Sequence, residues 1–239
     1  MTVPFYVAPE QVMKDRADYA RKGIARGRAM VAVRYADGVA MVAENSSATL
    51  RKISEIYDRI ACAGVGRYNE FDQLRVAGVR AADLKGYQYS RDDVDARSLA
   101  NQYAQILGQI FTHEMKPMEV EILVAEVGHT TDGDQMFHIN YDGTVFDERD
   151  YAVLGGDSAT ISTRFTEAAG DRLGDGFQLG DAVRAAVTAL SGPDRTLVAD
   201  DLEIALLVRS ESRRCFKRLT DEEVGALLAA ADAAAVEPS

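Results

Sequence analysis

Residues 30–44, MVAVRYADGVAMVAE, carry the clearest structural signal in this chain. Two apolar runs, Met30 to Tyr35 and Val39 to Glu44, flank the dipeptide Asp37-Gly38. An Asp-Gly pair between such runs predicts a tight β-hairpin, because both residues tolerate the positive φ angles that the turn requires. We therefore expect an antiparallel strand pair as the first core element.

Further strand-like and helical segments surround this hairpin in blocks. A helix is expected before it, from about Pro9 to Arg26, with a proline in its first turn. The other expected strands are Lys52 to Tyr57, Arg59 to Val65, Val120 to Val127, Phe137 to Tyr141, Tyr151 to Leu154, Leu202 to Val208 and Arg213 to Leu219. Apolar spacing of three and four predicts a helix pair between the second and third of these strands and another pair before Leu202. A last helix begins with a capping box at Thr220 and Glu223.

This order of elements indicates the architecture. A doubly wound parallel sheet alternates single strands with helices, whereas here hairpin-linked strands alternate with helix pairs. Two antiparallel sheets packed face to face, with helices on both outer faces, would bury all the apolar faces. The predicted class is α+β, a four-layer αββα sandwich with an extra N-terminal helix. We expect one domain over residues 1–239, with a flexible tail over 229–239.

Composition limits the classes of function. The chain has 239 residues, of which 47% are hydrophobic and 27% charged, as in ordinary globular proteins. No apolar run approaches the roughly 18 residues that span a bilayer, and Met1 to Tyr6 does not resemble a signal peptide. A net charge of −11 argues against nucleic-acid binding. Cys62 and Cys215, each inside a predicted strand, are expected to be buried, reduced thiols of a cytoplasmic protein.

One segment departs from the acidic balance. Residues 14–28 contain six basic side chains and only two acidic ones. Such a patch could dock an acidic partner, or it could be the solvated face of an ordinary helix. Charge alone favours the second interpretation.

The sequence lacks the usual catalytic and metal-binding motifs. His113, His129 and His138 have no metal-ligand spacing, and we expect no metal or cofactor. A four-layer sandwich is also the fold of N-terminal-nucleophile hydrolases, so this class of enzyme has to be considered. In these enzymes a Thr, Ser or Cys stands at the head of the first core strand. Here that position reads Arg26-Gly27-Arg28-Ala29-Met30, and Thr2 precedes a whole helix. No catalytic residue is therefore expected.

Several segments, in collinear order from about Pro4 to about Leu228, resemble alpha-type subunits of proteasome core particles. They are Tyr19-Ala20-Arg21-Lys22-Gly23 with Gly27, Ala36-Asp37-Gly38-Val39, Leu50-Arg51-Lys52-Ile53-Ser54-Glu55-Ile56-Tyr57-Asp58 with Gly66, Tyr103-Ala104-Gln105, Pro117-Met118-Glu119-Val120-Glu121 and Asp142-Gly143. The resemblance is closest to the actinobacterial form, through Ala25-Arg26-Gly27, Tyr68-Asn69-Glu70-Phe71-Asp72 and Lys85-Gly86-Tyr87.

The resemblance agrees with the missing nucleophile. Alpha-type subunits keep the N-terminal helix that beta-type subunits remove when they expose their threonine, and Arg28-Ala29 stands where that threonine would be. Glu44 falls near the acidic partner of the beta-type site, as an orphan without its threonine. No lysine partner is evident, with Ala48 in its approximate place. A non-catalytic subunit is expected. The alternatives are a catalytic beta-type or other self-processing N-terminal-nucleophile hydrolase, and a stand-alone binding module.

The resemblance also implies partners. Seven alpha-type subunits form an outer ring that stacks on beta-type subunits and docks the C-terminal tails of a ring-shaped ATPase activator. Lys52 matches the lysine that pairs with the tail carboxylate, and Gly27 and Gly66 complete the implied pocket. In actinobacteria the substrates are often unfolded proteins tagged with a small protein modifier. No nucleic-acid or membrane partner is expected.

The implied gate lies in residues 1–8, with Pro4, Phe5 and Tyr6 as its central residues. Archaeal and eukaryotic alpha-type subunits carry a Tyr-Asp-Arg motif in this region, which is absent here. The closed gate is therefore expected to use aromatic and apolar packing.

Overall fold

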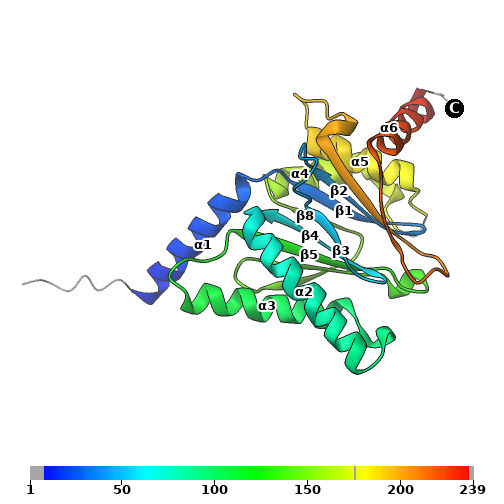
Figure 1. Ribbon diagram of the computed structural model, residues 1–239. Helices are drawn as coiled ribbons and strands as arrows, with labels where there is room; N and C mark the ends of the chain where they lie inside the picture. Colours follow the sequence, from blue (N-terminus) through cyan, green and yellow to red (C-terminus); the bar gives the residue numbers. More distant parts are fainter. Residues whose placement is uncertain (1–7, 175, 237–239) are drawn as a thin grey trace, which may run out of the picture.

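The computed structural model describes residues 8–174 and 176–236 (Figure 1). The strands are β1 Met30–Tyr35, β2 Gly38–Glu44, β3 Ile53–Tyr57, β4 Ile60–Gly66, β5 Val120–Glu126, β6 Gln135–Ile139, β7 Val145–Glu148, β8 Tyr151–Leu154, β9 Leu202–Val208 and β10 Phe216–Arg218. The helices are α1 Pro9–Ala25, α2 Tyr68–Gln88, α3 Ala96–His113, α4 Ser158–Ala169, α5 Leu179–Ser191 and α6 Asp221–Val236. Short 3-10 helices cover Arg91–Asp93, Thr131–Gly133, Gly170–Arg172 and Ala199–Asp201.

The strands form two antiparallel sheets of five strands each. The first sheet has the order β10-β9-β2-β1-β8 and the second has the order β3-β4-β5-β6-β7. The hairpin predicted at Asp37-Gly38 is confirmed, because Tyr35 pairs with Gly38 across the turn. Gly38 has φ +144°, and a Cβ there would lie 2.0 Å from the carbonyl oxygen of Leu207, so only glycine fits without strain.

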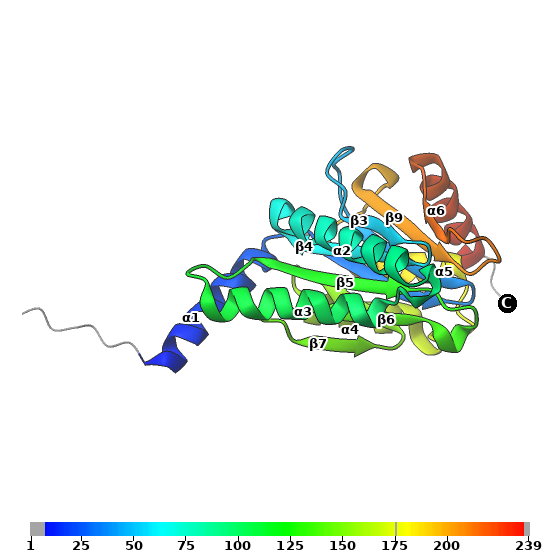
Figure 2. The ribbon, with the colours of Figure 1, turned by 60° about the horizontal axis from the view of Figure 1, so that its bottom comes forward.

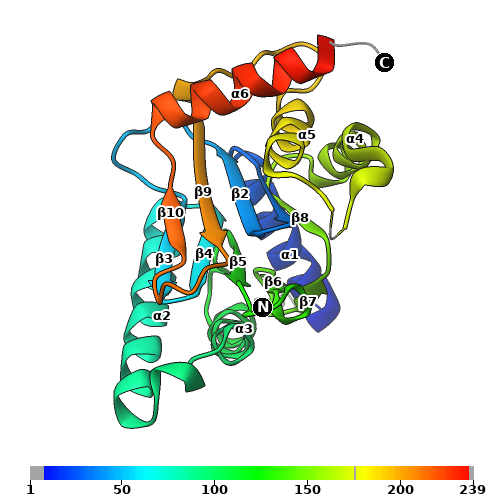
Figure 3. The same cartoon turned by 90° about the vertical axis from the view of Figure 1, so that its right-hand side faces the viewer.

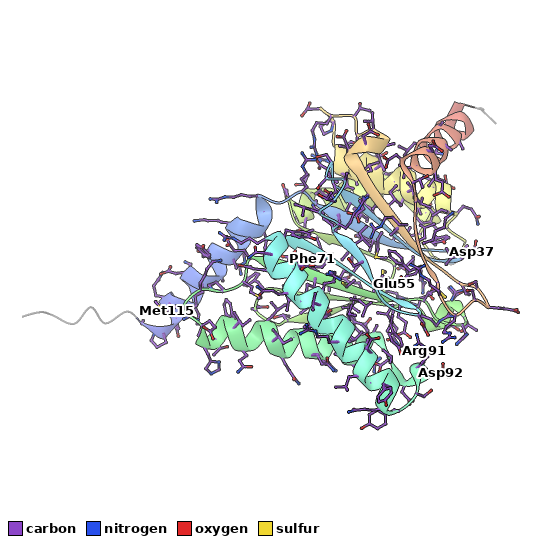
Figure 4. The ribbon with its side chains drawn as sticks, viewed as in Figure 1. Asp37, Glu55, Phe71, Arg91, Asp92 and Met115 are labelled. Carbon is purple, nitrogen blue, oxygen red and sulfur yellow. The ribbon has the colours of Figure 1, made fainter. Side chains whose placement is uncertain are left out.

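Three hydrophobic clusters separate the layers, and Figure 3 shows the layers end-on. Residues such as Val31 and Phe165 pack the first sheet against α4, α5 and α6. Met30 and Leu123 belong to the core between the two sheets. Phe71 of α2 packs over Gly64 of β4 on the outer face of the second sheet (Figure 4). The predicted αββα sandwich is therefore confirmed.

Helix α1 lies across one end of the sandwich, as Figure 2 shows. Its buried residues Ala20 and Ile24 join the core between the sheets. The backbone of Gly23 approaches Glu119 so closely that a Cβ there would lie 2.2 Å from a carboxylate oxygen. Met115 is at this end, while Arg91 and Asp92 lie at the opposite end (Figure 4). The segment after α1 therefore enters β1 at the α1 end of the molecule.

The chain departs from expectation in three details. Strand β7, Val145–Glu148, pairs with β6 where no strand was expected. Helix α6 continues to Val236, so residues 229–236, which were assigned to the tail, are helical. Its alanine-rich sequence has high helix propensity, which accounts for the extension. Cys215 precedes β10 instead of lying inside a strand, although both thiols are buried and unpaired. The capping box is present, with Glu223 N donating to Thr220 Oγ1 at 3.2 Å and Thr220 N to a Glu223 oxygen at 2.9 Å.

Over residues 8–174 and 176–236, no helix combines the length and apolarity that crossing a membrane requires.

Candidate functional site

The head of β1 is the position that would decide catalysis in this fold. Ala29 is buried there and accepts a hydrogen bond from Glu44 N at 3.1 Å through its carbonyl oxygen. Arg28 donates to the hydroxyl of Ser46 at 3.1 Å. Neither Arg28 nor Ala29 carries a hydroxyl or thiol, so the strand presents no nucleophile at this point.

Glu44 has no threonine beside it, as expected, but it has an arginine partner. Only 8% of this residue is exposed. Arg195 donates to both of its carboxylate oxygens, at 2.9 and 3.3 Å, and Arg28 Nε lies 3.8 Å away. A bidentate contact between one arginine and one carboxylate is geometrically specific, and it neutralises the charge of the buried carboxylate. Glu44 therefore has a structural role at the end of β2.

A lysine does reach the head of β1. The expectation that this site has no lysine, with Ala48 in its approximate place, is therefore wrong. Lys52 Nζ donates to the carbonyl oxygen of Arg28 at 2.5 Å. The segment between β2 and β3 crosses from one sheet to the other, so position along the chain was a poor guide to this contact. Burial lowers the pKa of Lys52 to about 8; Glu44 opposes this shift and Arg28 reinforces it.

The backbone that carries Lys52 is held by a buried carboxylate from the first sheet. Glu203, 2% exposed on β9, accepts hydrogen bonds from Lys52 N at 2.8 Å and Ile53 N at 3.3 Å. Asn45 donates to it at 2.7 Å, and Arg218 forms an ion pair with it. Sequence reasoning missed Glu203, although a single acid in the apolar run of Leu202–Val208 signals a buried charge that needs partners.

The two glycines of the predicted tail pocket lie against each other. A Cβ on Gly27 would lie 3.4 Å from the amide nitrogen of Gly66. Gly66 has φ +108°, and a Cβ there would lie 2.0 Å from the carbonyl oxygen of Glu119, so a side chain is excluded. Gly64 N donates to the carbonyl oxygen of Lys52 at 3.0 Å, which ties β3 to the strand that ends at Gly66. All three predicted pocket residues are thus at the α1 end, whereas Pro4, Phe5 and Tyr6 lie outside the described residues.

A cavity of about 470 Å³ adjoins this arrangement. Gly27, Arg28 and Ala29 line one part of it, and Glu44 and Arg195 line another. The start of α4 closes it, through Asp157 and its neighbours and through Arg164. The cavity is therefore polar and connects the head of β1 with the segment that follows α5.

A partly buried histidine, His138, lines a second cavity. His138 lies between Glu121 and Glu148, with nitrogen–oxygen distances of 3.6 and 3.8 Å. Burial lowers the pKa of His138, but the two carboxylates beside it outweigh this effect and raise the pKa to about 9. Within the part of the chain that the structure describes, no group of three or more His, Cys, Asp or Glu side chains could hold a metal ion.

Comparisons with known proteins agree with this fold. The family model described as "Proteasome subunit" matches residues 24–201. A protein named proteasome subunit alpha from Acidimicrobium ferrooxidans is 62% identical over 224 residues, which is 94% of this chain and 95% of that protein. Proteins of the same name from Kineococcus radiotolerans and Frankia alni are 54% and 52% identical over 239 aligned residues. Each covers 96% of this chain, and the alignments span 99% and 98% of those proteins.

These matches extend over nearly the whole chain and agree with a strand head that lacks a nucleophile. The chain belongs to the proteasome subunit family as an alpha-type subunit, the non-catalytic type of subunit in the proteasome core.

Proposed function

We propose that this chain forms the seven-membered outer ring of a bacterial proteasome core, gates the passage of unfolded protein and docks a ring-shaped ATPase activator. Its partners are then neighbouring alpha-type subunits, beta-type subunits, the activator tail and tagged protein substrates. It acts as one domain. The buried, unpaired thiols of Cys62 and Cys215 support a cytoplasmic location.

The position of Lys52 is the observation that carries the docking proposal. An ammonium group has three hydrogen-bond donors. Among the described residues, the Arg28 carbonyl oxygen is the only acceptor of a Lys52 Nζ hydrogen bond. Two donors therefore stay available for a carboxylate, which forms stronger hydrogen bonds with a charged donor than a neutral acceptor does. The tail carboxylate supplies such a group.

The glycines beside Lys52 support the same proposal. Gly27 and Gly66 are only partly buried, and neither presents a side chain at the place where their backbones meet. An extended peptide can approach bare backbone more closely than backbone that carries side chains. Lys52 would then fix the end of the tail while Gly27 and Gly66 leave room for the residues before it.

The proposed gate precedes α1. Pro4, Phe5 and Tyr6 supply apolar and aromatic side chains in the absence of a Tyr-Asp-Arg motif. A short segment of this type can shift between closed and open states when a ligand favours one of them.

The decisive experiment co-expresses this chain with a beta-type subunit and measures native mass, peptidase activity and activator-stimulated degradation. We expect a large barrel whose activity disappears when the beta threonine alone is replaced by alanine. The intact mass of the present chain should show no removed leader. A monomer that hydrolyses peptides by itself would contradict the proposal and favour a self-processing hydrolase.

A further inference from the structure

The cavity beside the head of β1 is unusually basic for this acidic protein. Three arginines line it, Arg28, Arg164 and Arg195, together with two carboxylates, Glu44 and Asp157. The cavity lining thus carries more positive than negative groups, whereas the whole chain has a net charge of −11. We refer to this site, defined by these five residues, as the arginine cavity.

Both carboxylates of the arginine cavity are already engaged. Glu44 accepts two hydrogen bonds from Arg195, which also donates to the carbonyl oxygen of Leu190 at 2.9 Å. Asp157 caps α4 by accepting hydrogen bonds from Thr160 N at 3.3 Å and Thr160 Oγ1 at 2.7 Å. Glu44, Arg195 and Asp157 therefore have little capacity for a ligand.

The other two guanidinium groups still have donors to offer. Arg28 donates to the hydroxyl of Ser46, and its Nε is 3.8 Å from Glu44. Among residues 8–174 and 176–236, Arg164 has no hydrogen bond and no ion pair within 4.0 Å, although its charge helps to lower the pKa of Asp157. Its guanidinium lies against Gly192, where a Cβ would be 2.7 Å from Nη1. Two planar cationic groups in one cavity suit a carboxylate, which arginine can bind through two parallel hydrogen bonds.

The arginine cavity adjoins the proposed tail pocket, because Gly27 and Arg28 belong to or contact both sites. Arg28 lines the cavity, and its carbonyl oxygen accepts the hydrogen bond from Lys52. Gly27, in the proposed pocket, also lines the cavity. An extended peptide advances roughly 3.3 Å per residue. A tail that ends at Lys52 therefore passes the arginine cavity within a few residues of its end.

The geometry points to the arginine cavity as a subsite for an acidic side chain, an aspartate or glutamate just upstream of the tail carboxylate that docks at Lys52. This inference rests on the proposed docking function and specifies the chemistry of the tail. Arg164 is the main recognition residue and Arg28 assists it.

The test measures peptide binding to the assembled core particle by fluorescence anisotropy. The probes are labelled peptides with about ten C-terminal residues of the ring ATPase from the same organism, with Asp or Asn placed in turn at each of the last few positions before the end. The variants are Arg164→Gln, which removes a guanidinium whose donors make no hydrogen bond among the described residues, and Arg213→Gln as the matched control. Arg213 is an exposed arginine in the loop after β9, at the far end of the strand from Glu44.

We expect the wild-type particle to prefer Asp over Asn at one position by about two- to five-fold, the range for a partly exposed charge pair. Arg164→Gln should abolish that preference without changing the affinity for the Asn peptide, and Arg213→Gln should retain it. Higher salt should reduce the preference.

Two other outcomes would overturn the inference in different ways. Equal binding of the Asp and Asn peptides at every position, with binding still dependent on Lys52 and on a free C-terminal carboxylate, would reject the arginine cavity and leave the docking function intact. Failure of every peptide to bind, while the intact ATPase also fails to stimulate degradation, would reject both.

Discussion

Arg195, in the segment after α5, donates to both carboxylate oxygens of Glu44 at the end of β2. The two residues are 151 positions apart in the chain. Their pair occupies the side of the strand head where a hydrolase would need a free carboxylate next to its nucleophile. Arg28 and Ala29, at the head of β1, carry no nucleophile. The site therefore lacks both a nucleophile and a free carboxylate, and it is suited to binding.

Lys52→Ala should impair activator docking. The loss of a charge-assisted hydrogen bond should weaken binding of each tail about ten-fold or more, since such bonds contribute roughly 1.5–3 kcal/mol. Activator-stimulated degradation should fall while native mass and basal peptidase activity are retained. Lys217→Ala is the control, because Lys217 of β10 forms its own ion pair with Glu223 of α6. Unchanged stimulation in the Lys52 variant would reject the pocket assignment.

Tail binding should depend on pH through Lys52. The pKa of Lys52 is lowered to about 8, mainly by burial, so half of the Lys52 side chains are neutral near that pH and most are neutral above pH 9. Affinity for a tail peptide should be constant near pH 7 and decline as pH rises through 8 toward 9. Lys52→Arg should bind more weakly but lose this decline, because a guanidinium stays charged. Wild-type affinity that is flat to pH 10 would show that Lys52 does not contact the tail.

Glu203→Gln should destabilise the full-length chain. The change leaves Arg218 without its anionic partner and weakens the hold on Lys52 N and Ile53 N. Breaking a buried pair costs about 3–5 kcal/mol. The free energy of unfolding, measured with urea, should show this loss. The matched control Glu55→Gln breaks a more exposed pair with Arg214 and should cost about 1 kcal/mol or less. Similar losses in both variants would show that the hydrogen bonds and ion pair of Glu203 do not stabilise this part of the chain.

His138 should make stability depend on pH. Its pKa is about 9 in the fold and about 6.5 in the unfolded chain, so the protonated form is favoured by folding. The stabilisation is fully present below pH 6.5 and is lost as pH rises through 9. Its upper limit is about 3 kcal/mol. The melting temperature of the wild type should therefore fall across this window more than that of His138→Gln. Parallel curves for the two proteins would show that the Glu121–His138–Glu148 cluster contributes nothing.

Removal of the proposed gate should speed peptide cleavage. A variant that begins at Pro9 lacks Pro4, Phe5 and Tyr6 but keeps α1 intact. In the assembled particle it should cleave small peptides several-fold faster without activator, because access no longer requires opening. Replacement of the beta threonine in the same particle is the control. An unchanged rate would count against a gate built from these residues.

Local sequence signals predicted the α-helices and every strand of the described residues except β7. Asp37-Gly38 identified the central hairpin, and apolar spacing of three and four identified the helix pair that covers the second sheet, with Phe71 on α2 and Tyr103 on α3 in its buried faces. These signals succeed because a turn depends on a few adjacent backbone angles and a buried face depends on residue spacing. The position of Cys215 was harder, because a short edge strand such as β10 carries little periodic signal.

By itself, the sequence determined the αββα order of elements, the absence of a nucleophile before β1 and the family resemblance. Only the tertiary structure decided which polar groups meet at the α1 end. Lys52 reaches the Arg28 carbonyl oxygen, Glu203 holds the amide of Lys52, and Glu44 binds Arg195, across separations of 24, 151 and 151 residues. The physical reason is that periodicity reports whether a side chain is buried, whereas the partner of a buried charge depends on which strands become neighbours. The register of β2 with β9, and the packing of one sheet on the other, set those neighbours.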